Sequence, residues 1–470
     1  MSWFEDFSKF LKIEEELDLF GIQIDGVKFW ERIRFEVYAT IINRASGGIK
    51  SSSRVGPSLS KLKRLVLSVL KFSRNPLRAP KSDILFIVSS RRFLEADGMW
   101  WDIYSEPIID NLDVSLVPIE TSFNNTHLTP AKTAHLRYFD YFEFMSYLKR
   151  RLGLVKVNFN ESERTILKKI QSEIKSAFDF DLNIEALTQR VLEERKVKLP
   201  YYVKMLKRIR PKIAILVQGY NREDIIEACK LEGVPSAELQ HGVIHPQHIA
   251  YSFAGESRTK EMFTDYLLLW GDHWKSGVEF PIPIENAISV GFPYLDLKRG
   301  EISTTSRKKQ ILFISQAIIG KVLSKFAVSL NNEIGREYSI LYKLHPRECA
   351  SWKERYPELA ASDIQVIDNP GIRLHSLFPE CSIQVGVCST AIYEGLFFGL
   401  ESYVVDAQCV ETMQSLLQQG LVTKVSTPEE LVGMIKDHGK SSKHDVSCFF
   451  QENSIERIKA FLDRFIHSEN

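Results

Sequence analysis

Short, uninterrupted apolar runs alternate with longer stretches of helical periodicity along most of this chain, and that alternation limits the possible folds more than any other feature. Typical runs are "DILFIVSS" (83–90), "PKIAILVQGY" (211–220) and "QILFISQ" (310–316). Each ends at glycine or polar residues, as strands do when they are buried on both faces of a parallel sheet. The helical stretches between the runs provide the crossovers that parallel strands require. The sequence therefore predicts an α/β fold.

The alternation is interrupted by "STTSRKKQ" (303–310), a polar stretch without apolar periodicity that we interpret as a linker. We predict two Rossmann-like, doubly wound domains that face a cleft, over residues 83–302 and 303–440. A helical N-terminal extension (1–82) and a helical C-terminal tail (441–470) flank them. In such sheets ligands bind beyond the carboxyl ends of the strands, so residues that follow strands are the first candidates for function.

The N-terminal extension contains a strongly basic segment. Between Val37 and Ser82 there are ten lysines and arginines and no aspartate or glutamate. Within it, "LSKLKRLVLSVLKFSR" places leucines and valines on one helical face and cations on the other, which is the composition of a helix that lies on an anionic membrane surface. A surface helix that docks its apolar stripe on its own domain has the same pattern, so both interpretations stay open.

Composition argues against several classes of protein. The formal net charge of +1 provides no field that would steer the chain to nucleic acid. Six cysteines lack C-x-x-C spacing, so we expect neither a disulfide framework nor a zinc knuckle, and a reducing compartment. No secretory signal is present, and no apolar run reaches the roughly 18 residues that span a bilayer. We expect a cytoplasmic protein, peripheral on the inner face of the cell membrane where its basic segment binds lipid.

Two strand ends in the second predicted domain carry residues suited to a phosphate group. In the first, "YKLHPRE", His345 follows a strand directly, Pro346 fixes the exit of the chain, and Lys343 adds positive charge. A histidine at the end of a strand is also a common turn residue. The interpretation as a site therefore depends on the second strand end.

The second strand end is "VGVCSTAIYEG", where Ser389 and Thr390 open a helix. Two hydroxyls and the N–H groups of a helix N-terminus bind anions such as phosphate. Glu394 lies one turn further along, where its carboxylate could reach a ribose hydroxyl. Ser-Thr is also an ordinary helix N-cap. Together the two strand ends predict a pocket for the phosphate of a nucleotide.

Three of the eleven histidines lie close together in the first predicted domain, within "AELQHGVIHPQH" (237–248). His241 follows a predicted strand, and a neutral imidazole with a pKa near 6.5 suits a general base. His245 and His248 flank Pro246, so they line the acceptor side or face solvent. The three could bind one metal ion from a helix, but Gly242 and Pro246 argue against a continuous helix. We therefore expect no metal and no other cofactor.

The motifs "KLHPRE" and "GVCSTAIYEGLFFGLESYVVD" resemble the His-Pro and paired-hydroxyl motifs of GT-B glycosyltransferases. The similarity is strongest to bacterial sialyltransferases, polysialyltransferases and capsular Kdo transferases, which use CMP-activated nonulosonates. CDP-glycerol glycerophosphotransferases share a similar pair. The resemblance extends as a pattern over roughly residues 83–440. It implies that His345 binds the donor phosphate together with Ser389 and Thr390, although many relatives carry a second serine where this chain has Thr390.

The resemblance also implies a general base in the first domain, but two candidates remain. The acidic-acidic-Gly motif of these families is matched best by "LEADGMWWD", where Asp97 is preceded by Glu95 rather than by an adjacent acid. Asp97 followed by Gly98 is equally well explained as a turn. The rival is His241, because a similarly placed His-Gly is thought to deprotonate the acceptor in the glycerophosphotransferases.

These observations favour a metal-independent glycosyltransferase that moves a sugar from a nucleotide donor to a surface polysaccharide or glycolipid. CMP-Kdo or another CMP-nonulosonate is the favoured donor, and the partners are this donor and a saccharide or lipid-linked acceptor. Transfer from CDP-glycerol or CDP-ribitol is the next alternative, and NDP-hexose transfer follows. A UDP-GlcNAc 2-epimerase-like enzyme and a non-catalytic assembly scaffold are the further alternatives. Walker and dinucleotide-binding motifs are absent, which argues against NTP hydrolysis and hydride transfer.

Overall fold

The structure of the protein is a computed structural model that describes residues 3–45, 74–95, 97–122, 126–254, 260–300, 307–334, 337–369, 371–437 and 445–467. The chain forms two compact units. Unit 1 comprises Met1–Trp270, Trp274–Val290 and Ser454–Asn470, and unit 2 comprises Gly271–His273 and Gly291–Asn453.

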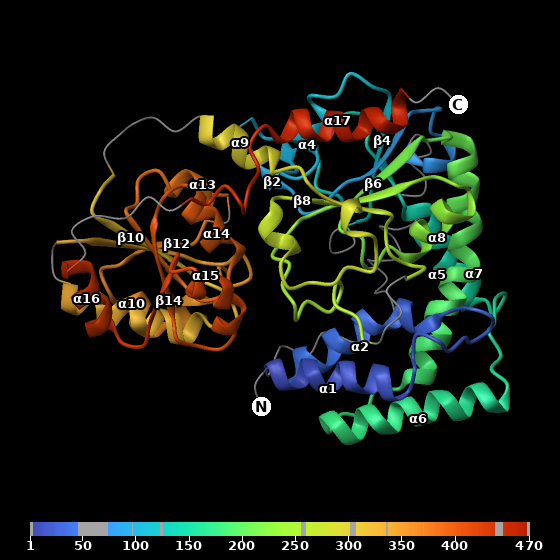
Figure 1. Cartoon of the computed structure of the whole chain (residues 1–470), viewed down its shortest axis with the longest axis horizontal. Coiled ribbons are helices and arrows are strands. Elements are labelled where there is room, and N and C mark those ends of the chain that lie inside the picture. Colours follow the sequence, from blue (N-terminus) through green and yellow to red (C-terminus); the bar gives the residue numbers. More distant parts are fainter. Residues whose placement is uncertain are drawn as a thin grey trace. The chain divides into compact units, whose positions relative to one another are not determined.

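Unit 1 contains a parallel sheet with helices on both faces (Figure 1). Its strands are β1 (Ile84–Ile87), β4 (Leu116–Glu120), β5 (Arg137–Tyr138), β6 (Ile213–Val217), β7 (Ser236–Leu239), β8 (Tyr266–Leu269) and β9 (Ala287–Ser289), with a small hairpin of β2 (Phe93–Leu94) and β3 (Trp100–Trp101). Its helices are α1 (Trp3–Glu16), α2 (Phe29–Ala45), α4 (Glu106–Ile109), α5 (Asp140–Arg151), α6 (Glu161–Phe178), α7 (Ile184–Ile209), α8 (Glu223–Leu231) and α17 (Ser454–Ile466), with short 3-10 turns η2 (Pro76–Arg78), η3 (Asp272–Lys275) and η4 (Ile284–Asn286) at its loops and boundary.

Unit 2 is a second parallel sheet with its own helices. Its strands are β10 (Gln310–Ile314), β11 (Ser339–Lys343), β12 (Gln365–Ile367), β13 (Ile383–Gly386), β14 (Glu401–Val405) and β15 (Thr423–Val425). Its helices are α9 (Pro293–Gly300), α10 (Gly320–Ile334), α11 (Trp352–Arg355), α12 (Pro357–Ala361), α13 (Leu374–Leu377), α14 (Thr390–Phe397), α15 (Gln414–Gln418) and α16 (Pro428–Asp437), with the 3-10 turn η5 (Val410–Met413).

Both sheets have the same strand topology. The order is β5-β4-β1-β6-β7-β8-β9 in unit 1 and β12-β11-β10-β13-β14-β15 in unit 2, and neighbouring strands are parallel. In each sheet the first strand is central, the next two strands are added on one side of it, and all later strands are added on its other side. The reversal lies between β1 and β6 in unit 1 and between β10 and β13 in unit 2. The predicted pair of Rossmann-like, doubly wound units is confirmed, and the reversal points are where such sheets bind ligands.

The continuous apolar runs are explained by burial on both faces of the sheet. On β1, Ile84 and Phe86 pack in one core cluster, whereas Leu85 and Ile87 pack in another. All four side chains are fully buried. A strand covered on both sides needs apolar residues at every position, which is why β1 shows no alternation in the sequence. The amphipathic helix α17 covers the first of these faces with residues that include Phe461.

The helices of the predicted N-terminal extension belong to unit 1. Helices α1 and α2 share a core cluster with α6 and α7. The guanidinium of Arg34 is buried on α2, where Nε donates to Oε1 of Glu14 over 2.8 Å and Nη2 donates to the carbonyl of Ser252 over 2.9 Å. Residues 46–73 of the basic segment lie outside the described residues, so its membrane interpretation stays a prediction. Among the helices that the structure describes, none is long and apolar enough to cross a bilayer.

Candidate functional site

His241 lies at the carboxyl edge of the unit 1 sheet, two residues beyond β7. Its Nε2 lies 2.9 Å from the hydroxyl of Tyr220, which follows the neighbouring strand β6. Its carbonyl accepts a hydrogen bond from the hydroxyl of Tyr104 over 2.9 Å. Next in the chain, Gly242 borders open space, because a Cβ built there would meet nothing within 4 Å. The strand end predicted from the sequence thus holds His241 against the end of β6, the strand that borders the reversal point of the sheet.

The surroundings of His241 keep its imidazole neutral. Burial is the main reason why its pKa is lowered to about 4, and the nearby guanidinium of Arg91 acts in the same direction. The other ring nitrogen, Nδ1, is buried and has no hydrogen-bond partner among the described residues. The imidazole is therefore neutral at physiological pH, as a general base must be, but with a pKa of about 4 it is a weaker base than the pKa near 6.5 expected from the sequence would make it.

Glu238 on β7 is a buried acid that the sequence analysis did not identify. Its carboxylate is 2% exposed, and its Oε1 accepts a hydrogen bond from the hydroxyl of Tyr251 over 2.7 Å. The same oxygen lies 4.0 Å from Nδ1 of His241. Burial raises the pKa of Glu238 to about 7, although the hydrogen bond from Tyr251 opposes that shift. An acidic residue inside an apolar strand was the signal that could have drawn attention to it.

The remaining histidines of the cluster make local contacts. Nδ1 of His245 accepts from the backbone N–H of Gln247 over 3.2 Å, and Nδ1 of His248 accepts from that of Ala250 over 3.3 Å. Burial lowers the pKa of both, that of His248 to about 3. Within the part of the chain that the structure describes, no group of three potential metal ligands is close enough to hold an ion.

Asp97 occupies the turn of the hairpin formed by β2 and β3. Its Oδ1 accepts from the backbone N–H of Met99 over 2.9 Å, and Gly98 has a positive φ of 79°. The backbone N–H of Glu95 donates to the carbonyl of Met99 over 2.9 Å. The side chain of Asp97 is exposed. These contacts are those of an Asp-Gly turn.

A buried charged network lies at the ends of β1 and β4, and sequence reasoning missed it. Arg92 donates to Oε1 of Glu106 over 2.6 Å and to Oε2 of Glu120 over 3.0 Å. His127 lies between two acids, with Nδ1 at 2.6 Å from Oε1 of Glu120 and Nε2 at 2.9 Å from Oδ2 of Asp140. A charged residue that ends an apolar strand, as Glu120 does, was the available signal.

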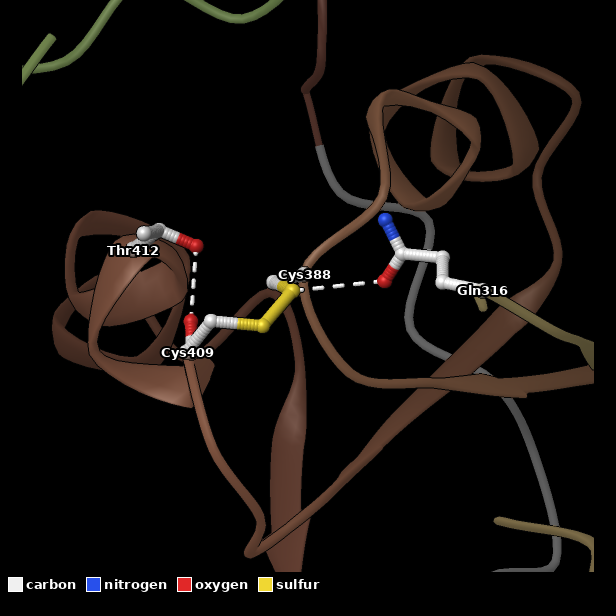
Figure 2. Close-up of a disulfide and its surroundings, with 4 residues drawn as sticks. All are labelled: Gln316, Cys388, Cys409 and Thr412. Carbon is white, nitrogen blue, oxygen red and sulfur yellow. Dashed lines mark hydrogen bonds between the residues drawn. A yellow bond between two sulfur atoms is a disulfide. The ribbon is translucent and has the colours of Figure 1, made fainter. Parts of the chain in front are cut away.

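In unit 2 the candidate site begins at the reversal point between β10 and β13. Cys388, two residues beyond β13, lies with its Sγ 3.2 Å from Oε1 of Gln316, which follows β10 (Figure 2). Cys388 also forms a disulfide with Cys409, which follows β14 (Figure 2). The carbonyl of Cys409 accepts from the hydroxyl of Thr412 over 2.8 Å. We expected no disulfide framework. This single bond arises because parallel pairing of β13 with β14 brings two distant strand ends together.

Ser389 and Thr390 open α14 as predicted from the sequence. Ser389 is the N-cap, and its Oγ accepts from the backbone N–H of Ala391 over 3.3 Å. Thr390 is the first helical residue and is half-buried. Oε2 of Glu394, one turn further along, lies 2.8 Å from Nε2 of His375, at an ion-pair distance but without the direction of a hydrogen bond.

His345 lies at the end of β11, the strand next to β10 on the side away from β13. Its Nδ1 accepts from the backbone N–H of Arg347 over 3.2 Å, and its own backbone N–H donates to Oε2 of Glu348 over 2.8 Å. Pro346 is exposed beside it. The side chain of Lys343 is turned to the neighbouring strand end, where Nζ donates to the carbonyl of Asn369 over 3.1 Å.

Glu348 is a second buried acid that the sequence analysis did not identify. It is fully buried, and its Oε1 accepts from the hydroxyl of Ser315 over 3.1 Å and from that of Tyr356. Ser315 follows β10 directly. The carboxylate of Glu348 therefore links the turn after β11, which contains His345, to the end of β10 through hydrogen bonds. The strand ends that carry His345, Gln316 and Ser389 are therefore neighbours at one edge of the unit 2 sheet.

No protein-family model and no curated protein matches the chain, but solved structures do. A putative UDP-N-acetylglucosamine 2-epimerase from Listeria monocytogenes aligns with a TM-score of 0.50 at 12% identity, over 83% of this chain and 98% of that chain. The UDP-GlcNAc 2-epimerase from Methanocaldococcus jannaschii gives a TM-score of 0.49 at 13% identity, over 81% and 99%. The wall teichoic acid polymerase TagF gives 0.39 at 13% identity, over 93% and 94%.

At this level of identity the likeness concerns the fold. The Listeria structure and the strand order of the two sheets agree on two Rossmann-like units of the GT-B type. The chemistry of the chain has to be argued from its own residues.

Proposed function

We propose that the chain is a metal-independent GT-B glycosyltransferase that transfers a sugar from a nucleotide donor to a surface polysaccharide or glycolipid. The observation that carries the proposal is the convergence of His345 and Ser389 on one edge of the unit 2 sheet, on either side of the strand end of β10. Ligands bind at this edge in doubly wound sheets, and the first turn of α14 adds the partial positive charge of a helix N-terminus.

In the proposed reaction, unit 2 binds the nucleotide and stabilises its departure. The imidazole of His345 and the hydroxyls of Ser389 and Thr390 donate hydrogen bonds to the phosphate, whose negative charge grows as its bond to the anomeric carbon breaks. These donors supply the stabilisation that a metal ion supplies in other transferases. Glu394 lies one turn inside the helix, where a ribose hydroxyl would be within its reach.

Unit 1 supplies the base. The acceptor hydroxyl replaces the hydroxyl of Tyr220 at Nε2 of His241 and gives up its proton there while its oxygen bonds to the anomeric carbon. We favour His241 over Asp97 because His241 is buried at the carboxyl edge of the sheet, against Tyr220 at the end of β6, whereas Asp97 lies in an exposed hairpin turn. Unit 1 also holds Glu95 and His245, which we propose to lie on the acceptor side. The reaction requires the two units to bring both substrates together.

CMP-Kdo or another CMP-nonulosonate is the favoured donor, on the strength of the motifs around His345 and Ser389. Transfer from CDP-glycerol or CDP-ribitol is the second candidate, because His241 is followed by glycine at a strand end, as in the motif of those enzymes. An epimerase of the kind found among the solved structures would use the same nucleotide site but would turn over its donor without an acceptor.

The first experiment is nucleotide binding, measured by thermal shift and calorimetry with CMP, CDP, UDP and GDP. We expect cytidine nucleotides to stabilise the wild type and His345→Ala to weaken that binding at least tenfold, as loss of one charge-assisted hydrogen bond does. His467→Ala is the matched control, because His467 is exposed at the end of α17. Binding of UDP or GDP without CMP would exclude the nonulosonate donor, and no nucleotide binding would favour the scaffold.

The second experiment separates the two units. His241→Asn should abolish transfer and leave the affinity for the nucleotide unchanged, because His241 belongs to unit 1 and the proposed nucleotide site to unit 2. Asp97→Asn should retain transfer. The opposite pattern would assign the base to Asp97.

A further inference from the structure

Nδ1 of His241 and Oε1 of Glu238 can each make one more hydrogen bond, and the two atoms lie near each other. Nδ1 of His241 is buried without a hydrogen-bond partner among the described residues, and Oε1 of Glu238 lies 4.0 Å away. Tyr251 donates to that same oxygen over 2.7 Å and so fixes the carboxylate beside the ring. A carboxyl oxygen accepts two hydrogen bonds, so Oε1 can serve both Tyr251 and His241.

The other oxygen of Glu238 lies beside a small pocket. A Cβ at Gly219 would lie 2.5 Å from Oε2, so the missing side chain of Gly219 makes room for the carboxylate. Gly219, Tyr220 and Glu238 all line a pocket of about 40 Å³. That volume holds a few water molecules but no sugar. Glu238 thus separates the imidazole of His241 from a site that can hold water.

The charge of Glu238 is not explained by a structural ion pair. Among the described residues, His241 is the one basic group within ion-pair distance of it. The other titratable groups that surround the pair or line the pocket are Arg91, Tyr220, His248 and Tyr251 near the two side chains, and Glu31, Arg34, Glu223 and Lys260 around the pocket. The carboxylate accepts from the hydroxyl of Tyr251 and from the backbone N–H of Gly219, both of which are uncharged, so His241 is the group on which its negative charge would act.

We propose that Glu238 is a positioning residue for His241, which orients the imidazole through Nδ1 and relays the proton that the ring takes up. When Nε2 accepts a proton from the acceptor hydroxyl, the proton on Nδ1 passes to Oε1 of the ionised Glu238, and the carboxylic acid formed in this way then loses its proton to water in the pocket and regains its charge. The ring stays neutral, with its proton now on Nε2 instead of Nδ1. The 4.0 Å separation has to shorten to about 2.8 Å for this step, as hydrogen bonds in catalytic sites often do when substrate binds. The relay rests on the proposed function, whereas the pairing of the two residues does not.

The pairing is tested by NMR titration of the His241 ring in selectively labelled full-length protein. In the wild type, the ring resonances should show a step near pH 7, where Glu238 ionises. Glu238→Gln should remove this step, because the isostere keeps the hydrogen bond of Tyr251 but not the charge. Glu223→Gln is the matched control, since Glu223 lines the same pocket, its pKa is also raised by burial to about 7, and His241 is absent from its contacts.

The pairing would be overturned if the resonances of the His241 ring still showed the step near pH 7 in Glu238→Gln. It would also be overturned if only Glu223→Gln removed that step. Should Glu238→Gln fail to fold, Glu238→Asp keeps the carboxylate, and a folded Glu238→Asp protein without any step would overturn it as well. Circular dichroism and thermal unfolding identify which variants are folded.

The relay is tested by the pH dependence of transfer. We expect kcat of the wild type to fall as the pH drops through about 7, and Glu238→Gln to lower kcat by at least about tenfold and to remove this limb, with the donor KM unchanged. A variant with the wild-type pH profile would refute the relay. If no transfer is found although the NMR step depends on Glu238, the proposed function fails while the pairing stands.

Discussion

The backbone N–H of His345 donates a hydrogen bond to Oε2 of Glu348 over 2.8 Å, and Glu348 is fully buried. The other carboxylate oxygen accepts from Ser315 and Tyr356. A single buried charge therefore fixes the turn after β11 against the end of β10. The position of the His345 imidazole depends on this carboxylate, which itself sits behind the proposed phosphate site.

Glu348→Gln should lower the free energy of unfolding by about 2 kcal/mol. Both carboxylate oxygens accept hydrogen bonds, and the amide nitrogen that replaces one of them cannot accept. Denaturation by urea measures this loss. The affinity for the nucleotide should fall together with stability. Glu380→Gln is the control, because its ion pair with Lys308 is exposed and screened by solvent, so its loss should leave stability almost unchanged. Equal effects of the two substitutions would contradict the structural role of Glu348.

Gly395 on α14 permits the helix to lie close to β13. A Cβ at this position would lie 2.1 Å from Oε1 of Gln384. Gln384 cannot move aside without breaking its hydrogen bonds to the carbonyl of Ile392 and the hydroxyl of Ser402, at 2.8 and 2.7 Å. We expect Gly395→Ala to destabilise the protein by about 1–3 kcal/mol. In contrast, Gly433→Ala should stabilise it by about 0.5–1 kcal/mol, because Gly433 is exposed on α16 with no atom within 4 Å of a new Cβ. Thermal unfolding of both variants compares these effects, and a neutral Gly395→Ala would show that α14 is free to move.

The two parallel sheets could be predicted from the sequence because their signal is local. Strands covered on both faces are continuous apolar runs, as at 84–87 and 311–314, and these runs show in a single pass along the chain. The position of α1 and α2 could not be predicted, because it depends on contacts between distant residues. Arg34, for example, bonds to Ser252 across more than two hundred residues.

The candidate site divides in the same way. His241, His345 and Ser389 could be found because each lies within three residues of the end of a strand. Glu238 and Glu348 were missed because what marks them is their burial and their hydrogen bonds, such as those from Tyr251 and Tyr356. The spacing of residues in the sequence reveals neither. The disulfide was missed for the same reason, since two adjacent strand ends join cysteines that are 21 residues apart in sequence.

The disulfide beside Ser389 can be tested by counting thiols. Under denaturing conditions the purified protein should expose four thiols before reduction and all six afterwards. Cys409→Ser should free Cys388 and lower the free energy of unfolding by about 2–4 kcal/mol, because the cross-link no longer restricts the unfolded chain. Cys349→Ser, which replaces a half-buried free thiol, is the control and should leave the bond intact. Six thiols before reduction would show that the pair remains reduced, as we expected from the sequence.

The stability of unit 1 should depend on pH through His127. Burial opposes the charged form of this imidazole, but its hydrogen bonds to Asp140 and Glu120 outweigh burial and raise its pKa from 6.5 to about 9. Because the folded state binds the proton more tightly than the unfolded state, the stabilisation is complete below pH 6.5 and is lost as the pH rises through about 9.

His127→Gln removes this contribution, so the difference in unfolding free energy between wild type and variant should shrink with rising pH. We expect a decrease of about 2 kcal/mol between pH values of roughly 7 and 10, which is less than the full shift implies because the ring is partly in contact with solvent. Urea denaturation of both proteins at several pH values measures this difference, and subtraction cancels the titration of other acids such as Glu238. His467→Gln serves as the control, because the exposed ion pair of His467 with Asp463 should give a difference that stays near zero at every pH. A difference for His127→Gln that is constant over this range would mean that His127 is neutral in the folded protein and that Glu120 and Asp140 hold it only by uncharged hydrogen bonds.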